Sequence, residues 1–386
     1  MPLHQRIVSI ESEIIGWRRS LHARPELLYE VEETAAFVAE KLRAFGCDVV
    51  ETGIGRTGVV GVIRGTGPGR SITLRSDMDA LPIEEETGTP YASQKPGMMH
   101  ACGHDGHMAM LLGAARHLCE TRDFSGTVNV VFQPAEEGGA GARAMIEDGL
   151  FERFETDAVY GMHNLPGMPV GSFGVRPGPI MASTDEFTLT VDGRGGHAAI
   201  PQLSRDPILA GSALVQALQQ VVARNVDPLD SLVLSVTQFH AGFVHNVIPD
   251  TAEVSGTVRS LSANGRALAE TRIREICAGI AAAHGVAIEV EYDRNYPVTM
   301  NDAAEAARCG EIAAAIAGIA QVDFAAQPLM AGEDFSYMLE KRPGAFVFIG
   351  NGPSASLHNA RYDFDDRALV YGASYWVELA KAATRA

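Results

Sequence analysis

Cysteine and basic residues are scarce in this chain, and each shortage excludes a class of protein. The 386 residues contain only five cysteines, which are odd in number and scattered. Such a set is not the framework of a disulfide-rich secreted domain, so we expect a reducing, cytoplasmic location. Lysine and arginine total 31 against 48 acidic residues, a net charge of −17. Because no basic run accompanies this balance, we expect no nucleic-acid partner.

Long apolar runs are also missing. No stretch approaches the roughly 20 apolar residues that a transmembrane helix needs, and charges interrupt the N-terminal region where a signal peptide would be apolar. We therefore expect no membrane partner. Hydrophobic residues nevertheless make up 46% of the chain and charged residues 20%, as in a folded globular protein. A chain of this length is too long to fold around one ordinary hydrophobic core, so we expect two domains.

The order of helical and extended patterns predicts an α/β domain. Amphipathic helices near the N-terminus and over residues 33–45 precede alternating β-rich and helical stretches. The β-rich stretches are 59–63, 71–75, 128–132 and 157–160, with helices after His107 and over 141–148. This alternation predicts a mixed sheet with helices on both faces. From Asp302 onward the pattern resumes with a helix, a strand over 346–349 and a C-terminal helix.

Between these two parts the pattern changes to β-α-β-β-α-β. Strands are predicted over 186–192, 232–239, 251–260 and 286–292, and helices over 206–224 and from Ser262 to near Gly285. This order is the ferredoxin-like α+β arrangement. Because it interrupts an α/β pattern, we predict that residues 183–296 are an inserted domain. Residues 1–182 and 297–386 then form one discontinuous catalytic domain.

Residues 99–107 (MHACGHDGH) place one thiol and three imidazoles within nine positions. Thiolate, imidazole and carboxylate groups are the ligands that borderline metals such as zinc prefer. A single Cys-x-His pair is weak evidence, but polar clusters follow four predicted strands, where open α/β sheets bind ligands. These clusters lie at Asp77 and Asp79, at 133–137, at His163 and at His358.

Five of these side chains are candidate metal ligands. They are Cys102, His104, Glu137, His163 and His358. Five donors exceed what a closed tetrahedral site needs, so we expect two divalent ions per subunit, with the Cys102 thiolate as the natural bridge. Two neighbouring carboxylates cannot address one metal equally well. We therefore assign Glu136 to a metal-activated water, as general base and then general acid.

Each candidate also has an ordinary interpretation. A histidine in a loop is more often a surface group or a satisfied core residue, which is what we expect for His22 and His117. Glu136 and Glu137 are also compatible with a solvated pair that starts a helix. His107 fits an orienting role behind a ligand. Asp77 and Asp79 either orient a ligand imidazole or cap a turn.

Nine motifs spread over nearly the whole chain resemble those of bacterial hippurate hydrolases and plant auxin-conjugate hydrolases. These enzymes belong to the aminoacylase and carboxypeptidase G superfamily of dinuclear amidohydrolases. The motifs are HARPEL (22–27), RSDMDALP (75–82), MHACGHDGH (99–107), QPAEEGG (133–139), GRGGHAAIP (193–201), NVIPD (246–250), GTVR (256–259), MAGEDF (330–335) and SLHN (356–359). The resemblance implies the same five metal ligands and the same base, Glu136.

The resemblance also implies roles outside the metal centre. His197 would stabilise the tetrahedral oxyanion and Asn246 would contact the substrate. Both lie in the inserted domain, which mediates dimerisation and acts as a lid in related enzymes, so we expect a homodimer or homotetramer. Arg259 would clamp the substrate carboxylate, and Gly332 would offer a backbone N–H.

One departure from the wider superfamily concerns the metal. Asp77-Met-Asp79 stands where many members have His-x-Asp, and Cys102 stands where they have an aspartate. Carboxylate-rich sites favour manganese whereas thiolates favour zinc, so both metals stay open.

These observations predict a metal-dependent amidohydrolase. It would cleave N-acyl-amino acids of the hippurate type to a carboxylic acid and a free amino acid. A dipeptidase or carboxypeptidase with the same centre is the nearest alternative. A second alternative makes Cys102 a nucleophile with a histidine base, which predicts inactivation by alkylation that chelators do not mimic. A third is a binding protein that kept the fold, although Glu136 and all five candidate ligands are present.

Overall fold

The computed structural model describes residues 3–385, so residues 1, 2 and 386 of the predicted catalytic domain lie outside the described chain. The protein divides into two compact units. Unit 1 comprises Met1–Ile180, Met300–Gln327 and Asp334–Ala386, and unit 2 comprises Met181–Thr299 and Pro328–Glu333. Strands β7 (Gly178–Met181) and β14 (Thr299–Asn301) lie where the chain passes from one unit to the other.

Unit 1 is built on a mixed sheet of eight strands within the described residues. In sheet order these are β1 (Val49–Ile54), β2 (Gly58–Arg64), β4 (Thr127–Gln133), β3 (Ser71–Asp77), β5 (Ala158–Leu165), β16 (Gly344–Gly350), β6 (Phe173–Gly174) and β15 (Val322–Asp323). The central strands β4, β3, β5 and β16 are parallel, whereas β1, β2 and β6 join the sheet in antiparallel pairs. The predicted α/β class with a mixed sheet is confirmed.

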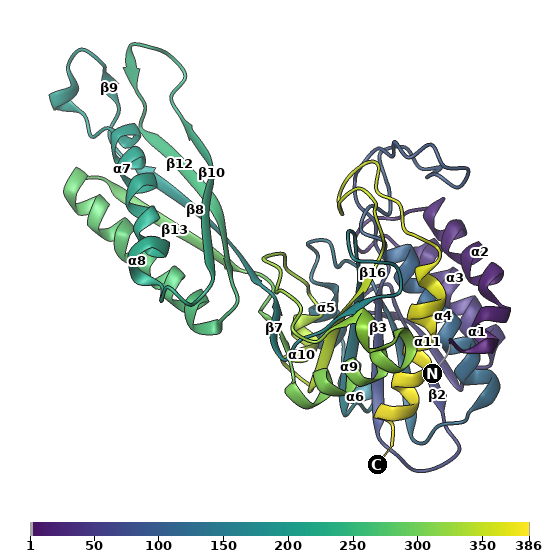
Figure 1. Ribbon diagram of the computed structural model, residues 1–386. Helices are drawn as coiled ribbons and strands as arrows, with labels where there is room; N and C mark the ends of the chain where they lie inside the picture. Colours follow the sequence, from purple (N-terminus) through teal and green to yellow (C-terminus); the bar gives the residue numbers. More distant parts are fainter. Residues whose placement is uncertain (1–2, 386) are drawn as a thin grey trace. The chain divides into compact units, whose positions relative to one another are not determined.

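The central strands are almost entirely buried, as expected for parallel strands covered on both faces. The helices of unit 1 are α1 (Gln5–Ser9), α2 (Glu11–His22), α3 (Glu32–Phe45), α4 (His104–Thr121), α5 (Gly141–Glu147), α6 (Leu150–Arg153), α9 (Ala303–Ala317), η3 (Ile319–Gln321), α10 (Ser336–Leu339) and α11 (Ala368–Ala383). Helix α4 packs against α2, α3 and α11, while α5, α6 and α10 form a separate group (Figure 1). Helix α4 is therefore the central helix of this unit, and nearly all of its residues are buried.

Unit 2 contains a four-stranded antiparallel sheet in the order β10-β12-β8-β13. Its elements are β8 (Ser183–Asp192), β9 (Gly196–His197), η1 (Pro201–Leu203), α7 (Pro207–Gln220), η2 (Val221–Asn225), β10 (Leu232–Ala241), β11 (Val247–Ile248), β12 (Thr251–Ser260), α8 (Ala263–His284) and β13 (Ala287–Arg294). Helices α7 and α8 lie side by side on the sheet (Figure 1). Burial alternates along β12, so one face of the sheet packs on these helices. The β-α-β-β-α-β order follows the prediction.

Local signals at the predicted helix ends agree with the structure. Gly46 and Gly285 adopt left-handed backbone conformations at the C-caps of α3 and α8, which glycine does without strain. The Ser262 side chain accepts a hydrogen bond from the Gly265 backbone and caps α8 at its start. None of the helices in residues 3–385 has the combined length and apolarity that a membrane crossing needs.

Candidate metal centre

The predicted metal-site residues of unit 1 gather at the carboxyl ends of its parallel strands. Asp77 ends β3 and pairs in register with Gln133, the last residue of β4. His163 lies inside β5, level with Phe348 of β16. The sequence pattern predicts that this strand ends at Tyr160, before His163, so that prediction of its end is wrong. The strand continues to Leu165 because its last residues pair with β16.

Helix α4 begins at His104 itself, with Cys102 just before it, whereas the sequence predicted a loop up to His107. Gly103 between them has a φ of +88°. A Cβ at Gly103 would lie 2.3 Å from Asn164 Nδ2 and 2.5 Å from the Tyr362 hydroxyl. Asn164 Nδ2 donates to the Cys102 carbonyl at 2.7 Å, and the Tyr362 hydroxyl donates to Asn164 Oδ1 at 2.6 Å. The segment that carries both candidate ligands is therefore held by Asn164, which Tyr362 holds in turn.

Two imidazoles turn their Nε2 atoms toward the same space. His104 Nδ1 donates to the Asp79 carbonyl at 2.7 Å, and His163 Nδ1 donates to the Asn164 carbonyl at 2.7 Å. Because Nδ1 carries the proton in each ring, the lone pair lies on Nε2, which faces the site. His104 Nε2 is buried with no hydrogen-bond partner in the described chain. His163 Nε2 faces Cys102 Sγ at 3.3 Å.

The two adjacent glutamates share one anchor, Asp79. Its carboxylate accepts from the Glu136 backbone N–H at 2.9 Å and from the Glu137 N–H at 3.1 Å. Glu137 Oε1 is buried without a hydrogen-bond partner among the described residues and lies 3.4 Å from His358 Nε2. Glu136 Oε1 instead accepts from the Asp334 N–H at 3.4 Å. Neighbouring residues thus point at different partners, as their predicted roles require.

The possible ligand atoms form overlapping sets of three within 4.8 Å of one another. Four of these sets contain a predicted ligand: Cys102–His104–His163, Asp77–His104–His107, Cys102–Glu137–His358 and His104–Glu136–Glu137. Cys102 belongs to two of them, which fits a bridging thiolate. His104 Nε2 and Glu137 Oε1, which form no hydrogen bond among the described residues, are both ligand types for zinc or manganese. These side chains therefore fit a divalent metal.

The pKa shifts at the site reflect an excess of negative charge. Burial raises the pKa of the Cys102 thiol well above its usual value, and Glu137, Glu136 and Asp77 raise it further. Burial alone would lower the pKa of His104, but Asp77, Asp79 and Glu137 outweigh it and raise that pKa to about 10. A bound cation would oppose these shifts, because it favours a thiolate and a neutral imidazole.

A second layer of side chains orients the ligands, and sequence reasoning identified little of it. His107 Nδ1 donates to Asp77 Oδ1 at 2.7 Å, and its Nε2 accepts from the Asn164 backbone N–H at 3.0 Å. Both ring nitrogens are therefore occupied, which supports the orienting role. Arg75 donates to Asp77 Oδ2 and to Asp334 Oδ1, both at 2.8 Å. The sequence offers no signal for Asn164 beyond its position next to His163.

The other four predicted residues belong to unit 2, at two ends of its sheet. His197 and Asn246 are exposed neighbours at the β9–β11 pair, where the Ala198 N–H donates to the Asn246 carbonyl at 3.0 Å. Arg259 pairs in register with Thr184, and Thr184 approaches Gly332 so closely that a Cβ there would lie 2.1 Å from its methyl carbon. Within β8, Thr184 and Asp192 mark these two ends, and they are separated by roughly 26 Å at about 3.3 Å per residue. The structure does not bring the two pairs together within one copy of unit 2.

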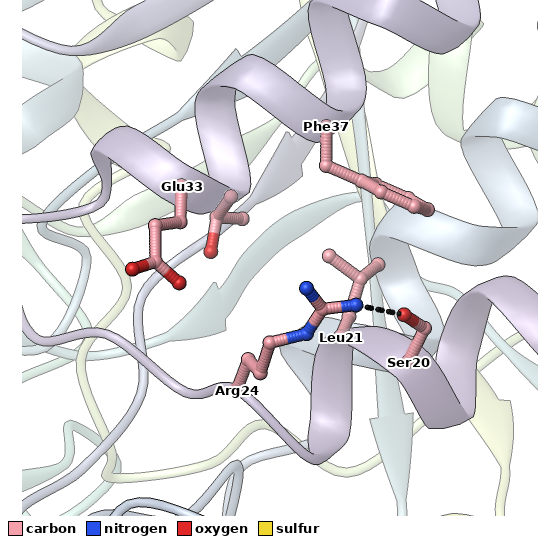
Figure 2. Close-up of a pocket in the computed structure, with 6 residues that line it drawn as sticks. Ser20, Leu21, Arg24, Glu33 and Phe37 are labelled. Atoms are coloured by element: carbon pink, nitrogen blue, oxygen red, sulfur yellow. Dashed lines mark hydrogen bonds between the residues drawn. The ribbon is translucent and has the colours of Figure 1, made fainter.

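Figure 2 shows a different pocket, formed by residues of helices α2 and α3 and by Arg24. Arg24 donates to the Ser20 hydroxyl there at 2.8 Å. The space measures about 30 Å³, enough for one or two water molecules. None of the predicted site residues lines it, and it is too small for an acyl-amino acid.

Comparison with known proteins identifies the family of this chain. The model of peptidase family M20/M25/M40 matches residues 73–382. The hippurate hydrolase of Campylobacter jejuni is 44% identical over 380 residues, covering 98% of this chain and 99% of that protein. The N-acetyl-L-cysteine deacetylase of Bacillus subtilis is 42% identical over 97% of this chain and 88% of its own length.

Among solved structures, the YXEP protein of Bacillus subtilis, a dinuclear metal-binding peptidase of the M20 family, has a TM-score of 0.86 to this chain. It is 36% identical, covering 98% of this chain and 99% of that one. The motif resemblance and the prediction of a hydrolase are confirmed by these matches. The chain belongs to peptidase family M20/M25/M40.

Proposed function

We propose that this protein hydrolyses the amide bond of N-acyl-amino acids of the hippurate type, releasing a carboxylic acid and a free amino acid. The observation that carries the proposal is the cluster of Cys102, His104, Glu137, His163 and His358, in which two buried ligand atoms, His104 Nε2 and Glu137 Oε1, have no hydrogen-bond partner among residues 3–385. The names of the full-length relatives, a hippurate hydrolase and an N-acetyl-L-cysteine deacetylase, support this substrate class.

The cofactor in this proposal is a pair of divalent ions per subunit, zinc or manganese. The five clustered ligands would hold them, with Cys102 shared between the two. When bound, such ions lower the pKa of a water molecule and polarise the substrate carbonyl. The dinuclear nature of the similar YXEP protein supports the count of two.

Glu136 is the proposed general base and acid. The Asp79 carboxylate holds its backbone N–H at 2.9 Å, and the Asp334 N–H donates to its Oε1 at 3.4 Å. Asp334 is itself held by Arg75 and Gln133, both at 2.8 Å. Glu136 takes a proton from the attacking water and passes it to the leaving nitrogen. A carboxylate whose backbone and one oxygen are both hydrogen-bonded can do this with little reorientation.

Arg259 is the proposed reader of the substrate carboxylate. Its side chain donates to backbone carbonyls of Val258 and Asp185, at 3.0 and 3.4 Å. Within residues 3–385 it forms no ion pair. Burial lowers the pKa of Arg259, although the group stays charged at neutral pH. A substrate carboxylate would supply the missing anionic partner, and the backbone N–H of Gly332 would add a donor.

His197 and Asn246 are proposed to act from a second copy of the chain. They lie at the opposite end of the unit 2 sheet from Arg259, roughly 26 Å away along β8, so one copy of unit 2 does not present all three to one substrate. Exposed apolar residues surround that end, among them Leu203 and Phe243 at 65% and 89% exposure. A homodimer or homotetramer through the inserted domain would cover them. The five unpaired cysteines fit a cytoplasmic location.

The primary test measures amino-acid release from N-benzoyl- and N-acetyl-amino acids and from dipeptides. Metal-stripped protein should be inactive, and zinc or manganese should restore cleavage of the acyl-amino acids. Glu136→Gln should lower turnover by about 10²–10⁴-fold with bound metal unchanged. The same change at the neighbouring residue, Glu137→Gln, should lower turnover and also reduce the amount of bound metal. Activity that survives exhaustive chelation would overturn the proposal, and preferential dipeptide cleavage would reassign the substrate.

Mixing two inactive variants tests the contribution of the second copy. Glu136→Gln and His197→Ala proteins, unfolded and refolded together, form mixed dimers that contain one site with both residues intact. If His197 acts in the other subunit, activity should recover to about a quarter of the wild-type value. No recovery would show that His197 acts within its own chain.

A further inference from the structure

Two thiols outside the metal centre lie side by side in unit 1. Cys47 Sγ and Cys119 Sγ are 3.5 Å apart, although 72 residues separate them in the chain. Cys47 is half-buried in the connection between α3 and β1, and Cys119 lies in the last turn of α4. Neither takes part in the proposed hydrolysis, so their proximity needs another explanation.

The backbone on both sides of this pair is firmly held. The Cys47 N–H donates to the Leu42 carbonyl at 3.2 Å, and the next residue, Asp48, donates to the Val62 carbonyl at 2.8 Å. Arg122 joins the two segments, because its side chain donates to the carbonyls of Gly46 and Cys119, at 2.6 and 3.1 Å. The sulfur atoms therefore face each other between anchored elements.

We propose that Cys47 and Cys119 are a modification site that forms a reversible disulfide on exposure to a low-molecular-weight disulfide. The sulfurs must approach from 3.5 Å to about 2.05 Å, about 0.7 Å each. The hydrogen bond from Cys47 and the charge of Arg122 lower the pKa of the Cys119 thiol, against the effect of burial. A thiolate is the form that attacks a disulfide.

The reaction balances as two successive exchanges. One protein thiol loses its proton and attacks the small disulfide, so that a mixed disulfide forms and one small thiolate leaves. The second protein thiol loses its proton and attacks the mixed disulfide, which forms the Cys47–Cys119 bond and releases the second small thiolate. The two protein thiols are oxidised by two electrons, and the small disulfide is reduced to two thiols. The new bond closes a loop of the chain and links the end of α4 to the segment just before β1.

The test treats the metal-loaded protein with oxidised glutathione, then alkylates the remaining thiols under denaturing conditions. Of the five cysteines, two should be protected, and peptide mapping should place the link between Cys47 and Cys119. Because a bridge restricts the unfolded chain, the midpoint of thermal unfolding should rise by several degrees and return with a reductant. The buried Cys277 of unit 2 supplies the control, since Cys277→Ala should form the same link.

The variant Cys47→Ser separates the two steps. Without the resolving thiol, Cys119 should keep glutathione as a stable adduct, and the midpoint should not rise. Three results would each overturn the proposal: five free thiols after oxidation of the wild type, a stable glutathione adduct on the wild type, or a link that involves another cysteine. Peptide mapping of the wild type decides this even if the variant does not fold.

Discussion

Gly103 separates the candidate ligands Cys102 and His104, and its surroundings leave no room for a side chain. Its φ of +88° strains any residue with a Cβ. The Cβ would also meet Asn164 Nδ2, the group that donates to the Cys102 carbonyl. A change at Gly103 therefore acts on the ligands at both of its sides.

We expect Gly103→Ala to lower the free energy of unfolding by about 2–5 kcal/mol, from backbone strain and overpacking together. Its metal content should fall as well, because Cys102 and His104 shift. Gly16→Ala in α2 is the matched control, since a Cβ there meets nothing within 4 Å. The free energy of unfolding of this control should be unchanged or higher by about 0.5–1 kcal/mol. Urea unfolding and metal analysis measure both effects, and equal behaviour of the two variants would contradict the role of Gly103.

Between elements, a buried charge network ties helix α2 to the start of helix α4. Arg18 and His22 of α2 donate to Asp105 of α4 at 2.8 and 2.9 Å. Arg18 is fully buried and also pairs with Asp363 at 2.9 Å. His22 is thus a buried core residue and not a surface group; its Nδ1 is hydrogen-bonded to Asp105, and its Nε2 lies 3.3 Å from Glu85 Oε2. Because Asp105 follows His104, this network also holds the end of α4 that carries a candidate ligand.

This network gives a pH prediction. Burial would lower the pKa of His22, but Asp105 and Glu85 outweigh it and raise that pKa to about 9. A raised pKa means that the contribution of His22 to stability is complete below its unfolded value of about 6.5 and is lost as the pH rises through about 9. The stability difference between wild type and His22→Gln should be on the order of 3 kcal/mol near pH 6, should shrink as the pH rises from about 6.5 to 9, and should be small above pH 9.

Denaturant unfolding across pH 5–10 measures this difference. His117→Gln is the control of opposite sign, because burial and the nearby His4 and Lys381 lower the pKa of His117 to about 4. The wild type should therefore lose stability relative to His117→Gln as the pH falls below about 6.5. A His22→Gln difference that does not change with pH would show that the charge on His22 has no role.

For the whole molecule, the two units make different contributions. Unit 1 contains all five candidate ligands, whereas unit 2 contains the exposed His197 and Asn246. Metal binding should therefore stabilise unit 1 and leave the unfolding of unit 2 unaffected, provided that the units unfold separately.

We expect zinc or manganese to raise the thermal midpoint of the metal-stripped protein. Free metal at about 100 times its dissociation constant contributes about 2.7 kcal/mol, which corresponds to several degrees. His104→Ala should reduce this shift, whereas His240→Ala, an exposed change in unit 2, should keep it. Calorimetry measures the shift, and an equal shift in both variants would place the metal elsewhere.

Much of the fold was predictable because its signals are local. Strand β12 spans the predicted residues 251–260, and α8 lies between the predicted Ser262 and Gly285. Capping serines, C-terminal glycines and apolar periodicity each act within a few residues. The strand β1 was not predicted, because it lies at the edge of the sheet and its burial does not alternate.

Most of the helices and strands, the fold class and the chemistry of the donor side chains follow from the sequence alone, because these depend on neighbouring residues and on side-chain type. Other features arise only in the folded chain: which nitrogen of His104 is free, that both ring nitrogens of His107 are hydrogen-bonded, and that Cys47 lies beside Cys119. The folded chain also places Arg259 at one end of the unit 2 sheet and His197 beyond the other. These facts depend on contacts between residues far apart in the chain, and strand register and helix packing set those contacts.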